Sequence, residues 1–140
     1  MGDEKIDRKK DPPKTHKDLD VWQEAMQLAR DTYALTAGFQ KEELYGLTLQ
    51  ARRCAVSIHS NIAEGAAKRS NKEFVRSLSI ALGSLAELET QLLLAQDIGF
   101  RFNDLVFNRI EHIRKMLLGL LRALKRRPIT HHPSPITLVP

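Results

Sequence analysis

The side chains in this sequence that could bind a ligand are mainly cationic, and they gather in two segments. Between residues 105 and 127 seven basic residues accompany a single acidic one, Glu111. A second basic group surrounds residues 68–76. Clustered Lys and Arg can neutralise phosphates, which gives a salt-dependent and largely sequence-independent affinity for nucleic acid. An ordinary solvated helix surface has the same composition, and this alternative stays open. The candidate nucleic-acid-binding residues are Lys68, Arg69, Lys72, Arg76, Arg122, Lys125, Arg126 and Arg127. We expect no stacking on single-stranded bases, because aromatic residues do not alternate with these basic ones.

A second polar group lies close to predicted apolar seams. It consists of Arg52, Arg53, Asn61, Glu64, Glu87 and Glu89. Polar residues buried beside a core are usually paired, and such pairs can fix the register of packed helices. We therefore expect Arg52 or Arg53 to pair with Glu87 or Glu89, within one subunit or across an interface. A structural role is favoured over ligand binding.

The residue types needed for catalysis or metal binding do not occur at useful spacings. A di-iron bundle requires Glu-x-x-His pairs on two helices, and no Glu here is followed three residues later by His. The sequence contains neither a glycine-rich phosphate loop nor a Ser-His-Asp arrangement. The single cysteine, Cys54, falls on a predicted core seam and is expected to be a buried thiol. We expect no catalytic residue, metal, cofactor or small-molecule substrate, unless an enzyme site forms between subunits.

Composition indicates one helical domain with two tails. The chain has 140 residues, of which 42% are hydrophobic and only 6% aromatic, and its formal net charge is +5. We expect a flexible charged tail at 1–16, a helical domain at 17–127 and a Pro-rich tail at 128–140. A basic surface fits an anionic partner but is also a common aid to solubility.

The sequence has no run that approaches the roughly 18 apolar residues of a membrane span, and its charged N-terminus does not resemble a signal peptide. We therefore expect a cytoplasmic protein without membrane contact.

Four helices are predicted, over residues 19–36, 42–66, 71–98 and 104–125. Gly38 and Gly99 follow helix ends, Ser70 and Glu73 form a capping-box signature, and Asn103 is a suitable N-cap. Each helix carries an apolar seam with steps of three and four residues. In the first helix the seam is Leu19, Trp22, Met26, Ala29 and Tyr33; in the third it is Phe74, Leu78, Ala81, Leu85, Leu88, Leu92 and Ala95. Short connections favour an all-α, up-down-up-down antiparallel four-helix bundle.

Several helices carry more apolar surface than one bundle needs. The second helix has a further stripe that includes Ala55, and the third has a face of small and apolar residues. Surplus apolar faces indicate burial by self-association or by a protein partner, although wide stripes could instead contribute to a thick core. The expected oligomer interface comprises Leu49, Val56, Ser79, Ile80, Gly83, Ala86, Leu93 and Leu94.

Five segments of the sequence resemble one known family. They are residues 19–23, 50–58, 60–65, 73–78 and 83–89, and the third contains the distinctive run Asn-Ile-Ala-Glu-Gly at 61–65. The chain thereby resembles, over about residues 17–125, the four-helix bundle proteins encoded in intervening sequences of 23S ribosomal RNA genes. Gln40 stands where that family usually has Pro, and Cys54 where it usually has Ala.

The resemblance implies both an assembly and a class of partner. Members of this fold are known as five-fold rings, so we expect a homopentamer. The chain is also similar to accessory subunits of diversity-generating retroelements, which assist a reverse transcriptase and bind nucleic acid through a basic ring surface. The expected function is non-enzymatic binding of RNA or a ribonucleoprotein. The alternative is a protein-interaction scaffold, such as an accessory subunit of a reverse transcriptase.

Overall fold

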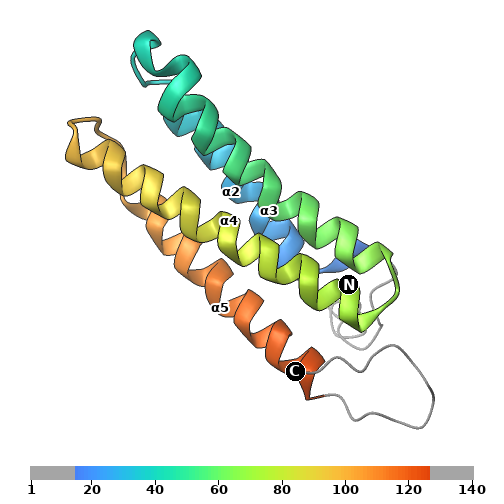
Figure 1. The fold of residues 1–140 in the computed structure, drawn as a ribbon. Coiled ribbons are helices and arrows are strands. Elements are labelled where there is room, and N and C mark those ends of the chain that lie inside the picture. The colour runs from blue at the N-terminus through green and yellow to red at the C-terminus, as the bar shows by residue number, and fades with distance from the viewer. Residues whose placement is uncertain (1–14, 127–140) are drawn as a thin grey trace, which may run out of the picture.

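Four long helices make up the fold. The computed structural model describes residues 15–126. The long helices are α2 (Asp20–Thr36), α3 (Leu49–Ala67), α4 (Asn71–Asp97) and α5 (Leu105–Lys125), with no strand in the described part of the chain (Figure 1). Short helical turns are η1 (His16–Asp18), η2 (Lys41–Glu43) and η3 (Leu44–Thr48). The protein is thus an all-α four-helix bundle.

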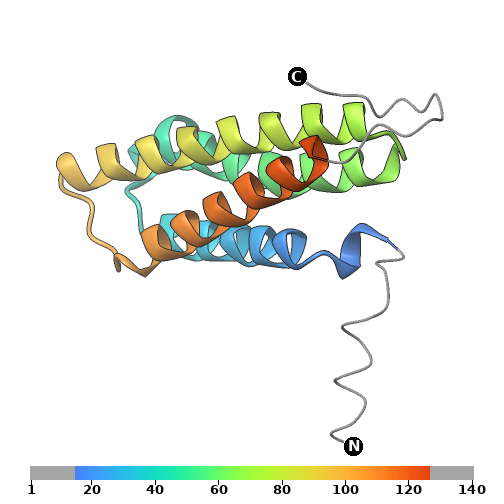
Figure 2. The ribbon, with the colours of Figure 1, turned by 90° about the horizontal axis from the view of Figure 1, so that it is seen from below.

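An aliphatic core runs along the bundle axis and confirms most of the predicted seams. In α4, every seam residue from Leu78 to Ala95 is fully buried. In α3, Ala51, Cys54, Ile58 and Ile62 are buried, and α5 contributes Val106, Ile110, Ile113, Leu117, Leu121 and Leu124. Figure 2 shows how the four helices that contribute these residues lie alongside one another. The three-and-four spacing identified most of the core of these three helices, but on α5 Leu121 is buried where the spacing predicted Leu120.

The buried face of α2 differs from the predicted seam. Tyr33 is 46% exposed, whereas Thr32 and Thr36 are buried. Each threonine hydroxyl donates to a carbonyl one turn earlier, Thr32 Oγ1 to Leu28 O at 2.8 Å and Thr36 Oγ1 to Thr32 O at 2.7 Å. Because these hydroxyls are satisfied within the helix, threonine can occupy the core and turn Tyr33 outwards.

The second predicted helix is interrupted before α3 begins. η3 is a π-helical turn in which Gly46 leaves the helical region, with φ −101° and ψ −107°. The Glu43 side chain accepts a hydrogen bond from the backbone amide of Leu47 at 3.2 Å. The prediction of a continuous helix from residue 42 was therefore wrong. Gly46 interrupts it, because glycine can adopt a backbone conformation that other residues avoid.

α3 and α4 pack closely through small side chains. The hydroxyls of Ser57 and Ser84 are 2.8 Å apart, and a Cβ atom added to Gly65 would lie 2.6 Å from Ser77 Cβ. Asn61 Nδ2 donates to the carbonyl of Ser57 at 2.8 Å. Ala55, expected on the outer stripe, is fully buried. Within the Asn-Ile-Ala-Glu-Gly run, Gly65 therefore allows the two helices to approach.

Hydropathy distinguishes α4 from the other helices of the described residues. α4 is long and apolar enough to cross a membrane by length and composition alone, with a mean hydropathy of 1.3 over its best 18-residue window. One third of that window is buried inside the bundle. Length and composition are weak evidence for a membrane span, and α4 meets both criteria because its inner and outer faces are apolar.

Replacing Gly65 by Ala should lower the free energy of unfolding by about 1–3 kcal/mol, because the added methyl overlaps Ser77 across the α3–α4 contact. Urea unfolding followed by circular dichroism measures the change. Gly119→Ala in α5 is the matched control, since a Cβ there meets nothing within 4 Å. It should stabilise the helix by about 0.5–1 kcal/mol. Equal effects at the two glycines would contradict the proposed packing constraint.

Candidate nucleic-acid interface

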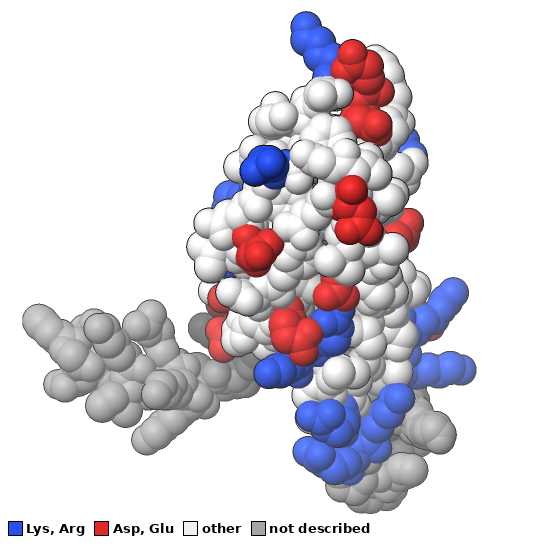
Figure 3. All heavy atoms as spheres, turned by 90° about the vertical axis from the view of Figure 1, so that its left-hand side faces the viewer, with Lys and Arg blue, Asp and Glu red and all other residues white. Residues whose placement is uncertain are grey.

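The structure places both predicted basic groups at one end of the bundle. α3 ends and α4 begins there, and the end of α5 lies at the same end in both Figures 1 and 2. Seven of the predicted nucleic-acid-binding residues are exposed at this end, and we call them the basic end: Lys68, Arg69, Lys72, Arg76, Arg122, Lys125 and Arg126. Arg127 lies outside the described residues. Figure 3 shows basic side chains gathered at the end of α5, whereas acidic and basic side chains mix farther up that face.

Acidic side chains counter only part of this charge. Lys68 lies 3.8 Å from Glu64, and Arg76 lies 3.9 Å from Glu73, in exposed pairs within one helical turn. Such pairs contribute little energy and are screened by salt. The other five cations of the basic end form no ion pair with any residue from 15 to 126. Their charge is therefore available to an anionic partner.

Two further arginines of α5 serve the fold instead. Arg109 donates to Glu24 at 2.6 Å and to Asp31 at 2.8 Å, which ties α5 to α2. Arg114 pairs with Glu89 of α4 and with Glu111. These side chains are only a quarter to a third exposed. Charge counting in the sequence could not separate these structural arginines from the free ones.

The turn between α3 and α4 contains a conformation unusual for its residue type. Arg69 has φ +55°, in the left-handed region, and is the only non-glycine residue with positive φ in the described part of the chain. It occupies the position just beyond a helix C-cap, where glycine is strongly preferred. The left-handed region costs other residues roughly 1–2 kcal/mol. Strain of this kind often marks positions at which a side chain is needed for function.

Helix capping fixes the exit from this turn. The Ser70 hydroxyl accepts a hydrogen bond from the backbone amide of Glu73 at 3.3 Å, which supports the predicted N-cap of α4. At the other end of the bundle, the side chain of Asn103 accepts from the amide of Leu105 at 2.8 Å. The Ser70 cap holds Lys72 and Arg76 on the first turns of α4, beside Arg69.

The predicted pairing between the arginines of α3 and the glutamates of α4 is not made within the chain. Arg52 instead donates to Thr36 Oγ1 at 2.9 Å and lies over the ring of Tyr33, 4.5 Å from its centre. Glu89 pairs with Arg114. Within the chain, the outward turn of Tyr33 gives Arg52 a partner on α2, and α5 supplies a cation to Glu89. The alternative pairing across an interface stays a prediction.

The other members of that polar group have separate roles. Glu64 pairs with Lys68, and Asn61 binds the backbone of its own helix. Arg53 is exposed.

The single cysteine, Cys54, is buried on α3. Burial, aided by the neighbouring carboxylate of Glu87, raises the pKa of the Cys54 thiol to about 11. Because the thiolate is the reactive form, Cys54 is poorly suited to nucleophilic chemistry at neutral pH.

The expected interface residues lie largely on the outside of the single chain. Ile80, Leu93 and Leu94 of α4 are 47–49% exposed, and Val56 of α3 is 37% exposed. Ser79, Gly83 and Ala86 are also exposed, whereas Leu49 is half-buried. The surplus apolar surface of α4 therefore does not contribute to this chain's own core.

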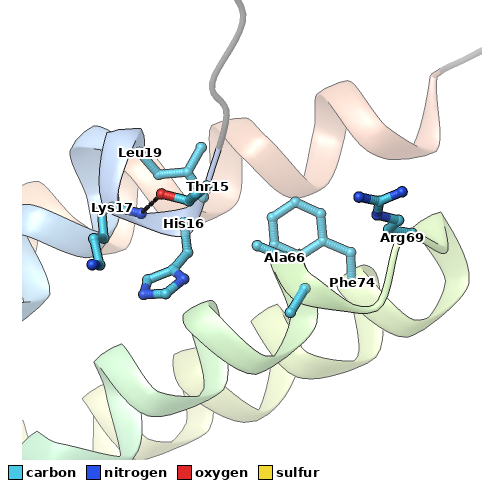
Figure 4. A pocket seen from close by; sticks show the side chains of 8 residues that line it. Thr15, His16, Lys17, Leu19, Ala66, Arg69 and Phe74 are labelled. Carbon is cyan, nitrogen blue, oxygen red and sulfur yellow. Dashed lines mark hydrogen bonds between the residues drawn. The ribbon is translucent and has the colours of Figure 1, made fainter.

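A cavity beside the basic end was not foreseen from the sequence. It has a volume of about 610 Å³ and lies between η1 and the α3–α4 turn. His16, Lys17, Arg69 and Phe74 contribute side chains to its wall (Figure 4). Aromatic rings thus lie next to the cations after all, contrary to expectation, because folding brings residue 16 to the turn at residue 69. Phe74 already stands between Lys72 and Arg76 in the sequence, whereas the sequence carries no signal for the approach of His16 to this turn.

Comparison with known families identifies the chain. Residues 17–119 match the 23S rRNA-intervening sequence proteins. The chain belongs to this family. No curated protein matches it.

The family match divides the basic end into two parts. The turn from Lys68 to Arg76 lies inside the matched region, whereas Arg122, Lys125 and Arg126 lie beyond its end at residue 119. The strained Arg69 and the Ser70 cap are thus part of the family domain. In this 23S rRNA-intervening sequence protein, the last turn of α5 adds further charge to that turn.

Replacing Arg69 by Gly should raise the free energy of unfolding by about 1 kcal/mol, because glycine adopts positive φ without steric cost. Arg69→Ala is the matched control, since it removes the same charge and keeps the strained conformation. Denaturant unfolding of both variants measures the difference. If the glycine variant were no more stable than the alanine variant, the Arg69 backbone would not be strained.

Proposed function

We propose that this protein binds RNA, alone or as a ribonucleoprotein, at the basic end and without catalysing a reaction. The observation that supports the proposal is the collection of seven exposed cations at one end of the bundle, five of them without an ion pair to a described residue. A further observation supports the proposal: Arg69, in the turn between α3 and α4, has a backbone conformation that favours glycine.

The chemistry of the surface favours a polyanion over a small anion. The cations come from the end of α3, the start of α4 and the end of α5, so they are spread over a surface. Phosphates repeated along a nucleic-acid backbone can meet several of them at once. Each contact releases condensed counterions, so affinity should fall steeply as salt rises.

The proposal includes a homo-oligomeric ring, expected to be a pentamer, of up-down-up-down antiparallel bundles. Its support is the exposed apolar face of α4, centred on Ile80, Leu93 and Leu94. Small residues between them, such as Gly83, permit close approach of a second helix. A ring would repeat the basic end in every subunit, and multivalency would then strengthen modest single contacts.

The same apolar face favours a second candidate function. A protein partner, such as a reverse transcriptase, could cover Ile80, Leu93 and Leu94 in place of another subunit. The protein would then be an interaction scaffold. Such an apolar contact should respond little to salt, which separates it from electrostatic binding of RNA.

Affinity for RNA should fall steeply between 50 and 200 mM salt, and Arg69→Gly should weaken binding about tenfold at a fixed salt concentration. Fluorescence anisotropy with a labelled single-stranded 20-nucleotide RNA measures both effects. Lys41→Ala, which removes an exposed charge from η2 at the opposite end, is the control and should leave binding unchanged. Binding that is insensitive to salt, or equally weakened by both variants, would contradict the proposal.

Replacing Gly83 by Leu should disrupt the oligomer before it unfolds the bundle. A Cβ at Gly83 meets nothing within 4 Å in the single chain, so the bulk projects outwards. Sedimentation velocity should show an assembly for the unaltered protein and smaller species for the variant, with unchanged helical circular dichroism. Gly83→Ala, a minimal change, is the control. A wild-type species at the monomer mass of 15.9 kDa would overturn self-assembly.

A further inference from the structure

The cavity between η1 and the α3–α4 turn combines features that are rarely found together on a solvated surface. Its volume of about 610 Å³ falls within the usual range for ligand pockets. The wall includes the apolar side chains of Leu19 and Ala66, the rings of His16 and Phe74, and the cationic chains of Lys17 and Arg69. No described residue that lines it is acidic.

Local contacts hold two sides of this cavity in place. The Thr15 side chain caps η1, accepting from the amide of Lys17 at 3.2 Å, and the Asp18 carboxylate accepts in return from the amide of Thr15. The His16 ring packs edge-on against Trp22 with centroids 5.0 Å apart. On the opposite wall, the Phe74 ring lies against the backbone at Gly65, so the α3–α4 packing positions it.

We propose that this cavity holds one unpaired base of a bound RNA. A nucleotide joins a flat, largely apolar ring to negative phosphates, and the wall offers two aromatic rings with a cationic side chain on either side of them (Figure 4). The base lies among His16, Phe74 and Ala66, and the adjacent phosphates meet Arg69 and Lys17. This inference rests on the proposed RNA binding and adds a preference for single strands.

The geometry excludes a paired base as the occupant. A base within a duplex is stacked on both faces and cannot enter a side-chain pocket, whereas unpaired bases commonly stack on aromatic side chains. Arg69 belongs both to the cavity wall and to the basic end. The base pocket therefore continues directly into the surface proposed to follow the phosphate backbone.

The decisive experiment compares two labelled probes with the full-length protein by fluorescence anisotropy. One is an eight-nucleotide oligoadenylate, and the other is an abasic ribose-phosphate oligomer of the same length and charge. Stacking of one base is worth roughly 1–3 kcal/mol, so the oligoadenylate should bind at least about fivefold more tightly. Ala66→Phe, which fills the cavity with a ring, should bring the two affinities together without weakening the abasic probe.

Two further variants provide a matched control and a second, independent change in the cavity. Ala34→Phe adds the same ring to an exposed position near the end of α2, away from the cavity, and should preserve the preference. Phe74→Leu retains an apolar side chain against Gly65 but removes the ring, and should reduce the preference even if Ala66→Phe does not fold. Equal binding of both probes by the unaltered protein would overturn the base pocket and leave phosphate binding standing. Failure of both probes to bind would overturn the proposed function and this inference with it.

Discussion

The close contact between α3 and α4 is the constraint on which the other features depend. Gly65 has no room for a side chain beside Ser77, and the Ser57 and Ser84 hydroxyls meet farther along the same contact. This contact brings the end of α3 against the start of α4, so the connection between them must be a tight turn. The basic residues of the turn and the Phe74 wall of the cavity are consequently held by core packing, although they lie at the surface.

Arginine has three different roles in this bundle, and the surroundings of each residue decide which. Arg109 and Arg114 reach carboxylates on other helices and fix α5 against α2 and α4. Arg52 lies over Tyr33 and bonds to Thr36. Arg69, Arg122 and Arg126 face solvent at the basic end. A net charge of +5 therefore understates the local asymmetry, because most described acidic partners are used away from that end.

The sequence was most informative where a single physical rule dominates. The α4 seam followed from helical period alone, since its aliphatic residues have only the core to occupy. In α2 the rule failed because satisfied threonine hydroxyls can replace apolar side chains, which moved the buried face away from Tyr33. The contacts of Arg52 with Thr36 and Tyr33 depend on this shift, so the period of the seam alone could not identify them. The cations of the basic end could be listed from sequence, but their common location required the topology.

The cavity illustrates a limit of another kind. Its two rings are 58 positions apart in the sequence, and His16 with its neighbour Thr15 lies at the end of the segment 1–16 that was expected to be a flexible tail. That turn forms because Thr15 and Asp18 cap each other's backbone and because Trp22 provides a surface for the His16 ring. Short polar residues before a helix are common in tails, so composition alone does not distinguish a capped turn from disorder. A binding surface built from a cap, a strained arginine and a core-packed phenylalanine becomes visible only when the contacts that hold each of them are known.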